Sequence, residues 1–172
     1  MKILLFVVAC LASLCSAGQL NKPVSILTAG NVLFKTTGAN YNNTGVSLHI
    51  NASFFSTHKL QLLVETSADK FFGDKVYYVS AAGKEINKVI LYSIKAGPQL
   101  FVTRHVALSA TFGQTWHSIN AEGFSRDYGL QYGATGFIGR KKRFITRVVM
   151  VHNLKTDKIS RYVGVGLGYR VY

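Results

Sequence analysis

The sequence predicts an all-β chain: an eight-stranded, antiparallel, up-and-down β-barrel that crosses a membrane. Three observations lead to this prediction. Apolar and polar residues alternate along many segments, these segments are long, and the connections between them alternate between long and short. Alternation with a period of two indicates strands, because successive side chains point to opposite faces of a sheet. The composition agrees, since the 172 residues include 16 glycines and 12% aromatic residues but only 2 prolines.

Composition also excludes several classes of protein. Hydrophobic residues make up 48% of the chain, charged residues only 16%, and the mean hydropathy is +0.19. A disordered chain needs low hydrophobicity and dense charge, so disorder is excluded. The only two cysteines, Cys10 and Cys15, lie near the N-terminus, which excludes a disulfide-stapled domain for the rest of the chain. The length indicates a single domain.

Residues 1–18 have the pattern of a secretory signal peptide. Lys2 gives a positive start, residues 3–14 are apolar, and small residues precede a cleavage site near Gly18. Cleavage there would leave a barrel domain over residues 19–172. Cleavage before Cys10, with lipidation of that cysteine, is the alternative. No later apolar run approaches the ~20 residues of a spanning helix, so the exported chain is either soluble or inserted as a closed barrel.

Eight strands are expected, and their lengths and connections favour the membrane alternative. The ranges are about 24–36, 45–56, 59–67, 88–102, 105–117, 127–139, 143–154 and 160–172, with long connections at 37–44, 68–87, 118–126 and 155–159. Strands this long exceed the globular mean of ~5–6 residues and suit the ~9–11 residues that cross a bilayer. Long connections at one end and tight turns at the other are typical of outer-membrane barrels.

The polar face of these strands predicts a polar network inside the barrel. Glu65 is the only carboxylate that we expect within a strand, because the other six acidic residues fall in the long connections or at their edges. Unpaired buried charges are costly, so Glu65 should pair with basic residues. The predicted interior network consists of Glu65, Lys95, Gln99, Arg147 and Arg170. In a soluble barrel the same face would lie in water, and alternation alone does not separate the two cases.

Aromatic residues gather near the strand ends, as membrane–water interfaces favour. The expected interfacial aromatics are Phe54, Trp116, Tyr128, Phe144, Tyr169 and Tyr172.

Two segments resemble a known family. Ala96-Gly97-Pro98-Gln99-Leu100 and the final residues 163–172, which are rich in glycine and end in an aromatic residue, resemble small outer-membrane β-barrel proteins of the Bacteroidetes type. Val171 departs from the family pattern by separating Arg170 from Tyr172. The resemblance implies a porin-like or structural barrel without catalytic residues. It also implies that the barrel-assembly machinery recognises the C-terminal strand.

Motifs for catalysis, metals and cofactors are weak or missing from the sequence. It contains no P-loop, no dinucleotide-binding glycine motif and no His-Glu-x-x-His. The five histidines are scattered, so we expect no metal and no cofactor. His117, Ser118 and Glu122 could form a hydrolytic triad, which resembles the His, Ser and Glu of lipid A deacylases but has a different spacing. The alternative is an aromatic girdle that runs into a polar loop.

These observations predict a monomeric protein of the bacterial outer membrane with a structural, adhesive or narrow-pore role and no catalysis. Its expected partners are outer-membrane lipid and lipopolysaccharide, whose phosphates could pair with loop lysines, and no nucleic acid. The main alternative is a soluble, secreted, cationic barrel that binds a small apolar ligand, as lipocalins and avidins do. An outer-membrane lipid hydrolase is the minor alternative. The basic run Arg140–Arg143 is expected to be a periplasmic turn.

Overall fold

The computed structural model describes residues 25–37, 44–54, 59–72, 88–119, 124–155 and 160–171. The predicted signal peptide, its cleavage site, Cys10 and Tyr172 lie outside these ranges. The described residues form eight strands: β1 (Ser25–Thr37), β2 (Thr44–Phe54), β3 (Leu60–Phe72), β4 (Lys88–Phe101), β5 (Val106–Ile119), β6 (Phe124–Ile138), β7 (Phe144–Asn153) and β8 (Arg161–Val171). Among these residues, no helix is long and apolar enough to span a membrane.

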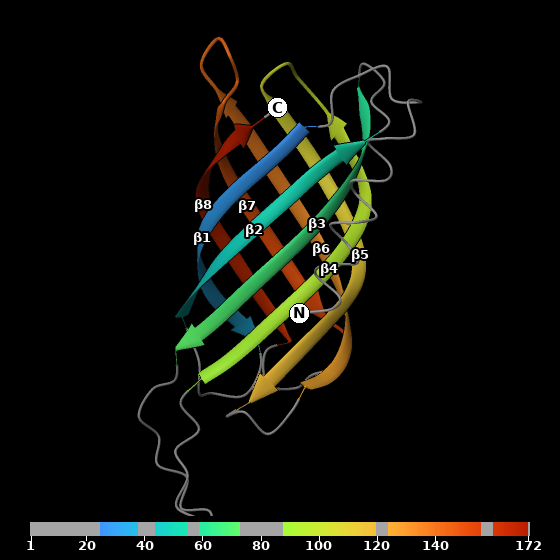
Figure 1. The fold of residues 1–172 in the computed structure, drawn as a ribbon, viewed down its shortest axis with the longest axis vertical. Helices are drawn as coiled ribbons and strands as arrows, with labels where there is room; N and C mark the ends of the chain where they lie inside the picture. Colours follow the sequence, from blue (N-terminus) through green and yellow to red (C-terminus); the bar gives the residue numbers. More distant parts are fainter. Residues whose placement is uncertain are drawn as a thin grey trace, which may run out of the picture.

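The strands close into a barrel of eight tilted, antiparallel neighbours (Figure 1). Each strand pairs with the next, and β1 pairs with β8 from Ile26 opposite Val171 to Thr37 opposite Arg161. The start of β1 and the end of β8 therefore lie at the same end as the short connections 102–105 and 139–143. We call this the short-connection end. The predicted fold class is confirmed.

The strands extend further into two expected connections than the sequence pattern indicated. β3 continues to Phe72, where residues 68–72 pair with both β2 and β4. β5 and β6 likewise reduce the expected connection 118–126 to residues 120–123. Asp69 and Asp127 therefore lie inside strands, and both are buried. The prediction that Glu65 is the only carboxylate within a strand is wrong, because a polar residue need not end a strand whose inner face is polar.

The two faces of the barrel wall are inverted relative to a soluble protein. Large apolar side chains on the outward face are exposed, among them Val32, Leu48, Leu108, Phe112, Tyr132, Val165 and Leu167. The inward face buries most of the polar side chains of the same strands. A soluble barrel that binds an apolar ligand needs an apolar interior and a polar exterior, so the described strands contradict that alternative.

The interior is divided into layers along the barrel axis. One apolar cluster lies toward the long-connection end and contains Leu33, Phe71, Val89, Leu91, Val151 and Tyr162. A second lies toward the short-connection end and contains Leu27, Ala29, Ala107, Phe137 and Ile145, with Phe101 packed against it. The polar side chains at mid-strand, around Glu65 and Arg147, lie between the two clusters. The polar layer therefore has a cluster of apolar side chains toward each end of the barrel.

Candidate functional site

The polar layer is built around a buried ion pair between Glu65 of β3 and Arg147 of β7. Arg147 Nη2 donates to Glu65 Oε2 across the lumen. Both side chains are at most 1% exposed. A charge buried this deeply is stable only when it is paired and hydrogen-bonded. The pair links strands on opposite parts of the wall, so it fills the space that a pore would need.

Three further polar side chains complete the environment of this pair. His49 Nδ1 lies 2.9 Å from Glu65 Oε1, and Gln131 Nε2 donates to the same oxygen at 2.5 Å. Asn51, with its amide oriented to suit both neighbours, donates to Glu65 Oε2 at 3.0 Å and accepts from Arg147 Nη1 at 3.1 Å. Glu65 therefore has a hydrogen-bond partner on each oxygen, which offsets the loss of its hydration.

A second part of the layer connects Lys95 and Asp69. Lys95 Nζ donates to Ser93 Oγ at 3.0 Å, and a hydrogen bond of 2.8 Å links Ser93 to Ser67. Ser67 and Tyr162 both donate to Asp69 Oδ2, at 3.3 and 2.6 Å.

His49 joins the two parts of the layer. While its Nδ1 faces Glu65, its Nε2 lies 3.4 Å from Asp69 Oδ1. Lys95 also approaches Gln131 Oε1, at 3.4 Å. The layer thus contains two carboxylates, Glu65 and Asp69, and two basic side chains, Arg147 and Lys95, with His49 between the carboxylates.

The structure brings together only part of the predicted interior network. Glu65 and Arg147 are in contact, and Lys95 lies in the same layer. Gln99 is buried but lies nearer the short-connection end, opposite Gln61 and Ser109. Arg170 lies at that end as well, where its Nε donates to Ser25 Oγ at 2.7 Å.

Several members of the layer were missing from the predicted network, namely His49, Asn51, Asp69, Gln131 and Tyr162. His49, Asn51 and Gln131 lie on the polar face that alternation identifies, so parity alone could have added them. Asp69 falls in the expected connection 68–87, so the sequence pattern does not place it in a strand. Tyr162 points inward from β8, where it donates to Asp69.

Four of the predicted interfacial aromatics lie on the outward side of the wall. Phe144 and Tyr169 pack edge to face, with ring centroids 5.5 Å apart, near the short-connection end. Tyr128 stacks on Phe112 at 5.9 Å near the other end, and Trp116 is half-buried beside it on β5. Phe54 is instead only 5% exposed. Alternation fails at the end of β2, where neighbouring Ala52 is also buried, so Phe54 does not contribute an exposed ring.

Glycines of β8 lie close to the backbone of β1. A methyl group added to Gly166 would meet the backbone oxygen of Gly30, and one added to Gly168 would meet that of Thr28. At Gly164 it would meet side chains of Val149 and Leu33. The row of glycines therefore lets the first and last strands approach closely where the barrel closes.

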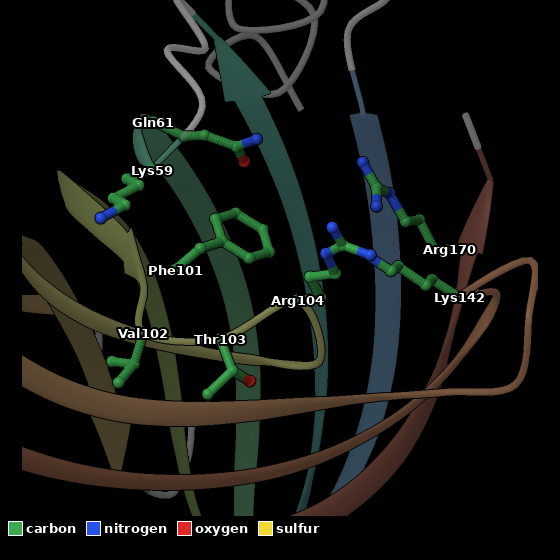
Figure 2. A pocket seen from close by; sticks show the side chains of 8 residues that line it. All are labelled: Lys59, Gln61, Phe101, Val102, Thr103, Arg104, Lys142 and Arg170. Atoms are coloured by element: carbon green, nitrogen blue, oxygen red, sulfur yellow. The ribbon is translucent and has the colours of Figure 1, made fainter.

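A basic recess opens at the short-connection end (Figure 2). It has a volume of about 480 Å³ and is lined by Lys59, Gln61, Phe101, Val102, Thr103, Arg104, Lys142 and Arg170. We call this cavity the basic recess. Its lining contains four cations and no carboxylate.

The structure describes two members of the candidate hydrolytic triad, His117 and Ser118. His117 Nε2 lies 3.1 Å from Ser125 Oγ, across the β5–β6 ladder, and Glu122 lies outside the described residues. Of the described carboxylates near that end, Asp127 accepts from the backbone amides of Tyr128 and Lys155. Within the described ranges, no group of three His, Cys, Asp or Glu side chains could hold a metal ion.

Comparison with known proteins identifies the fold. No protein-family model matches the sequence, and no characterised protein matches it by sequence alone. The solved structure of the Yersinia pestis outer membrane protein Ail in a phospholipid nanodisc superposes with a TM-score of 0.60 and 13% identity, over 87% of this chain and 100% of that chain. Neisserial surface protein A (NspA) gives 0.60 and 17%, over 87% and 99%.

A third similar structure is the N-terminal β-barrel domain of Pseudomonas aeruginosa OprF, with a TM-score of 0.52 and 15% identity, over 86% of this chain and 97% of that domain. This chain has the fold of small eight-stranded outer-membrane barrels. At these identities the similarity is one of fold alone. The resemblance to Bacteroidetes-type barrels stays a prediction, because these neighbours come from Yersinia, Neisseria and Pseudomonas.

Proposed function

We propose that this chain is a bacterial outer-membrane protein whose barrel is a closed anchor for its surface connections, with a structural or adhesive role. The observation that carries the proposal is the polar layer around Glu65 and Arg147, which fills the lumen. The outward apolar face supports a position in lipid, because a water-exposed band of this kind would drive association. The shared fold with outer-membrane barrels is consistent with that position.

The filled lumen favours an anchor over a narrow pore. An eight-stranded barrel has an interior just wide enough for side chains to fill. Here, apolar clusters lie on both sides of the polar layer. A hydrated ion would have to displace both clusters and separate the Glu65–Arg147 pair. Steady conduction is therefore not expected from this barrel.

The proposed location is tested by cell fractionation. Expressing cells are separated into soluble, inner-membrane and outer-membrane fractions, and each fraction is run unheated and boiled on a denaturing gel. We expect a band in the outer-membrane fraction that changes mobility on boiling, as a closed barrel resists detergent until heated. A soluble protein with unchanged mobility would contradict the proposal.

The anchor role is tested by conductance in planar bilayers. The folded wild-type protein should give no sustained current. The double variant Glu65→Ala/Arg147→Ala removes the centre of the polar layer and should give measurable current steps. Lys70→Ala/Arg126→Ala, which removes two exposed charges from the outward face, is the matched control and should be silent. Sustained, ohmic current through the wild type would show that the protein is a pore.

Lysines at the long-connection end support lipopolysaccharide as a partner. Lys70 Nζ lies 5.7 Å from the ring centroid of Phe72, and Lys155 Nζ lies 5.6 Å from that of Tyr128. Each lysine is thus held over an aromatic ring at the rim of the outward face, where lipid A phosphates would lie. Replacing both with glutamine should weaken binding of lipopolysaccharide to the folded protein, and unchanged binding would remove this partner from the proposal.

The proposal includes no catalytic activity. Among the described residues, the hydroxyl in contact with His117 is that of Ser125, whereas the expected triad used Ser118. The hydrolase alternative is tested with lipid A substrates. Hydrolysis by the wild type that is lost in His117→Ala would establish an enzyme.

A further inference from the structure

We infer that the basic recess is a binding site for a multivalent oxyanion of the phosphate class. Four cations line it, and each comes from a different element of the fold: Lys59 precedes β3, Arg104 lies between β4 and β5, Lys142 lies between β6 and β7, and Arg170 ends β8. Figure 2 shows the side chains of Arg104, Lys142 and Arg170 gathered on one side of the recess, with Lys59 on the other.

The charged side chains that line the recess in the described part of the chain are all positive. None of the seven Asp and Glu residues of the chain lies in the connections 55–59, 102–105 or 139–143. The described carboxylates are held elsewhere, Glu65 and Asp69 in the polar layer and Asp127 near the other end. A cluster of like charges in a concave wall focuses a positive potential and attracts counter-ions. An anionic ligand would therefore lower the free energy of this end of the barrel.

The side chain of Arg170 and the backbone turn that carries Arg104 are ordered before any ligand arrives. The Arg170 guanidinium donates to Ser25 and lies 5.7 Å from the ring centroid of Phe137. Thr103 Oγ1 accepts from the backbone amides of His105 and Val106, at 3.1 and 3.0 Å, which fixes the turn that carries Arg104. Order of this kind before binding reduces the conformational entropy that is lost when a ligand binds.

The turn that carries Lys142 is also ordered. The backbone amide of Lys142 donates to the carbonyl of Gly139 at 3.1 Å. Gly139 has a φ of 81° and Lys142 a φ of 51°. Both residues therefore adopt the left-handed backbone conformation, which lets the chain reverse direction between β6 and β7. Lys142 is half-buried, whereas Arg140 and Lys141 of the same turn are exposed. Only Lys142 of these three lines the recess.

The shape and the donors of the recess favour a phosphate-class ligand that carries several charges. Guanidinium groups bind phosphate oxygens through two parallel hydrogen bonds. A ligand with several negative charges can contact more than one of these four cations at once. A smaller cavity lies next to the recess and shares Gln61, Phe101 and Arg170 with it. It reaches Asn51 at the polar layer, where the Glu65–Arg147 pair occupies the lumen, and this arrangement suits binding rather than transit.

Such an oxyanion could be dissolved or carried by a lipid headgroup. The inference goes beyond the anchor role, because it concerns one mouth of the barrel and requires no conduction. It is tested with the folded full chain in a zwitterionic detergent, titrated with tripolyphosphate in a calorimeter at about 50 mM salt, where charges are only partly screened. The wild type should bind, and binding should weaken as salt increases.

The decisive comparison is between two double variants that each remove two positive charges from this end. Arg104→Gln/Lys142→Asn changes the recess, and asparagine tolerates the positive φ at position 142. Arg140→Gln/Lys141→Asn changes only exposed charges and is the control. Loss of charge-assisted hydrogen bonds should weaken tripolyphosphate binding about tenfold or more in the first variant. The second should stay within about threefold, as expected for screened surface charges.

Each outcome decides the inference. No binding by the wild type, or equal weakening in both variants, would overturn it. Mobility that still changes on boiling shows that each variant is folded, so a failure to bind is separate from a failure of the barrel. Nanodiscs identify the source of the ligand: if phosphatidylglycerol weakens tripolyphosphate binding relative to phosphatidylcholine alone, the recess takes a lipid headgroup. Equal binding in the two nanodiscs assigns a dissolved oxyanion.

Discussion

At the scale of single residues, the interior of this barrel is governed by compensation of charge. Glu65 is held by Arg147, Gln131 and Asn51, while Asp69 is held by Tyr162 and Ser67. Such a network stabilises a fold only while every member keeps its partners, since each loss leaves a buried polar group unsatisfied. The polar layer should therefore respond more strongly to the loss of one partner than to the loss of a pair.

Glu65→Gln is expected to lower the free energy of unfolding by about 3–5 kcal/mol, because it leaves Arg147 buried without its counter-charge. Glu65→Gln/Arg147→Met should lose less than the sum of the two single variants, by about 1–3 kcal/mol, as coupled sites do. Both quantities are measured by guanidinium unfolding of the folded protein in lipid vesicles.

Thr111→Val is the control for the single and double variants of Glu65 and Arg147. The Thr111 hydroxyl is buried and has no hydrogen-bond partner within the described part of the chain. Replacing it with a methyl group should change the free energy of unfolding by less than about 1 kcal/mol, because no bond is lost. Additive effects of the two single variants would show that Glu65 and Arg147 do not act as a pair.

At the scale of elements, close approach between strands depends on glycine at particular positions. Gly113 of β5 lies opposite Lys95, and a methyl group added there would meet the backbone oxygen of Ile94 in β4. Gly30 of β1 is different, since the nearest atom to an added methyl group is the backbone oxygen of Ser47 at 3.9 Å. The β4–β5 ladder therefore has less tolerance for a side chain than the β1–β2 ladder.

Gly113→Ala is expected to destabilise the barrel by about 1–3 kcal/mol, because an overpacked site forces the backbone to shift. Gly30→Ala is the matched control and should be neutral or stabilising by up to about 1 kcal/mol, since alanine restricts the unfolded chain more than glycine does. Unfolding in guanidinium measures both. Equal effects of the two substitutions would contradict the role assigned to the β4–β5 approach.

Strand number, pairing order and the inward face were predictable because alternation reports directly on the two faces of a sheet. The strand ends were not, as Asp69 illustrates: a carboxylate normally indicates a connection, but here Tyr162 on the distant strand β8 satisfies it. Contacts of this kind depend on which strands face each other across the lumen. The basic recess escaped prediction for the same reason, because its four cations come together only when the barrel closes.

At the scale of the whole molecule, the barrel is asymmetric along its axis. Cations gather in the short connections 55–59, 102–105 and 139–143, and none of the seven acidic residues lies in these connections. The polar layer lies at mid-barrel. Tight turns of outer-membrane barrels lie on the periplasmic side and longer connections lie outside the cell. The proposed anchor therefore places the basic recess in the periplasm and connection 73–87 at the surface.

This orientation predicts the labelling of single cysteines in whole cells. The chain has no cysteine after Cys15, so Tyr78→Cys and Lys141→Cys each provide one reactive thiol after removal of the signal peptide. A membrane-impermeant maleimide should label position 78 in intact cells, because connection 73–87 faces outward. It should label position 141 only after the outer membrane is permeabilised. The reverse pattern would show that the barrel is inserted with its short connections outside, and it would place the basic recess at the cell surface.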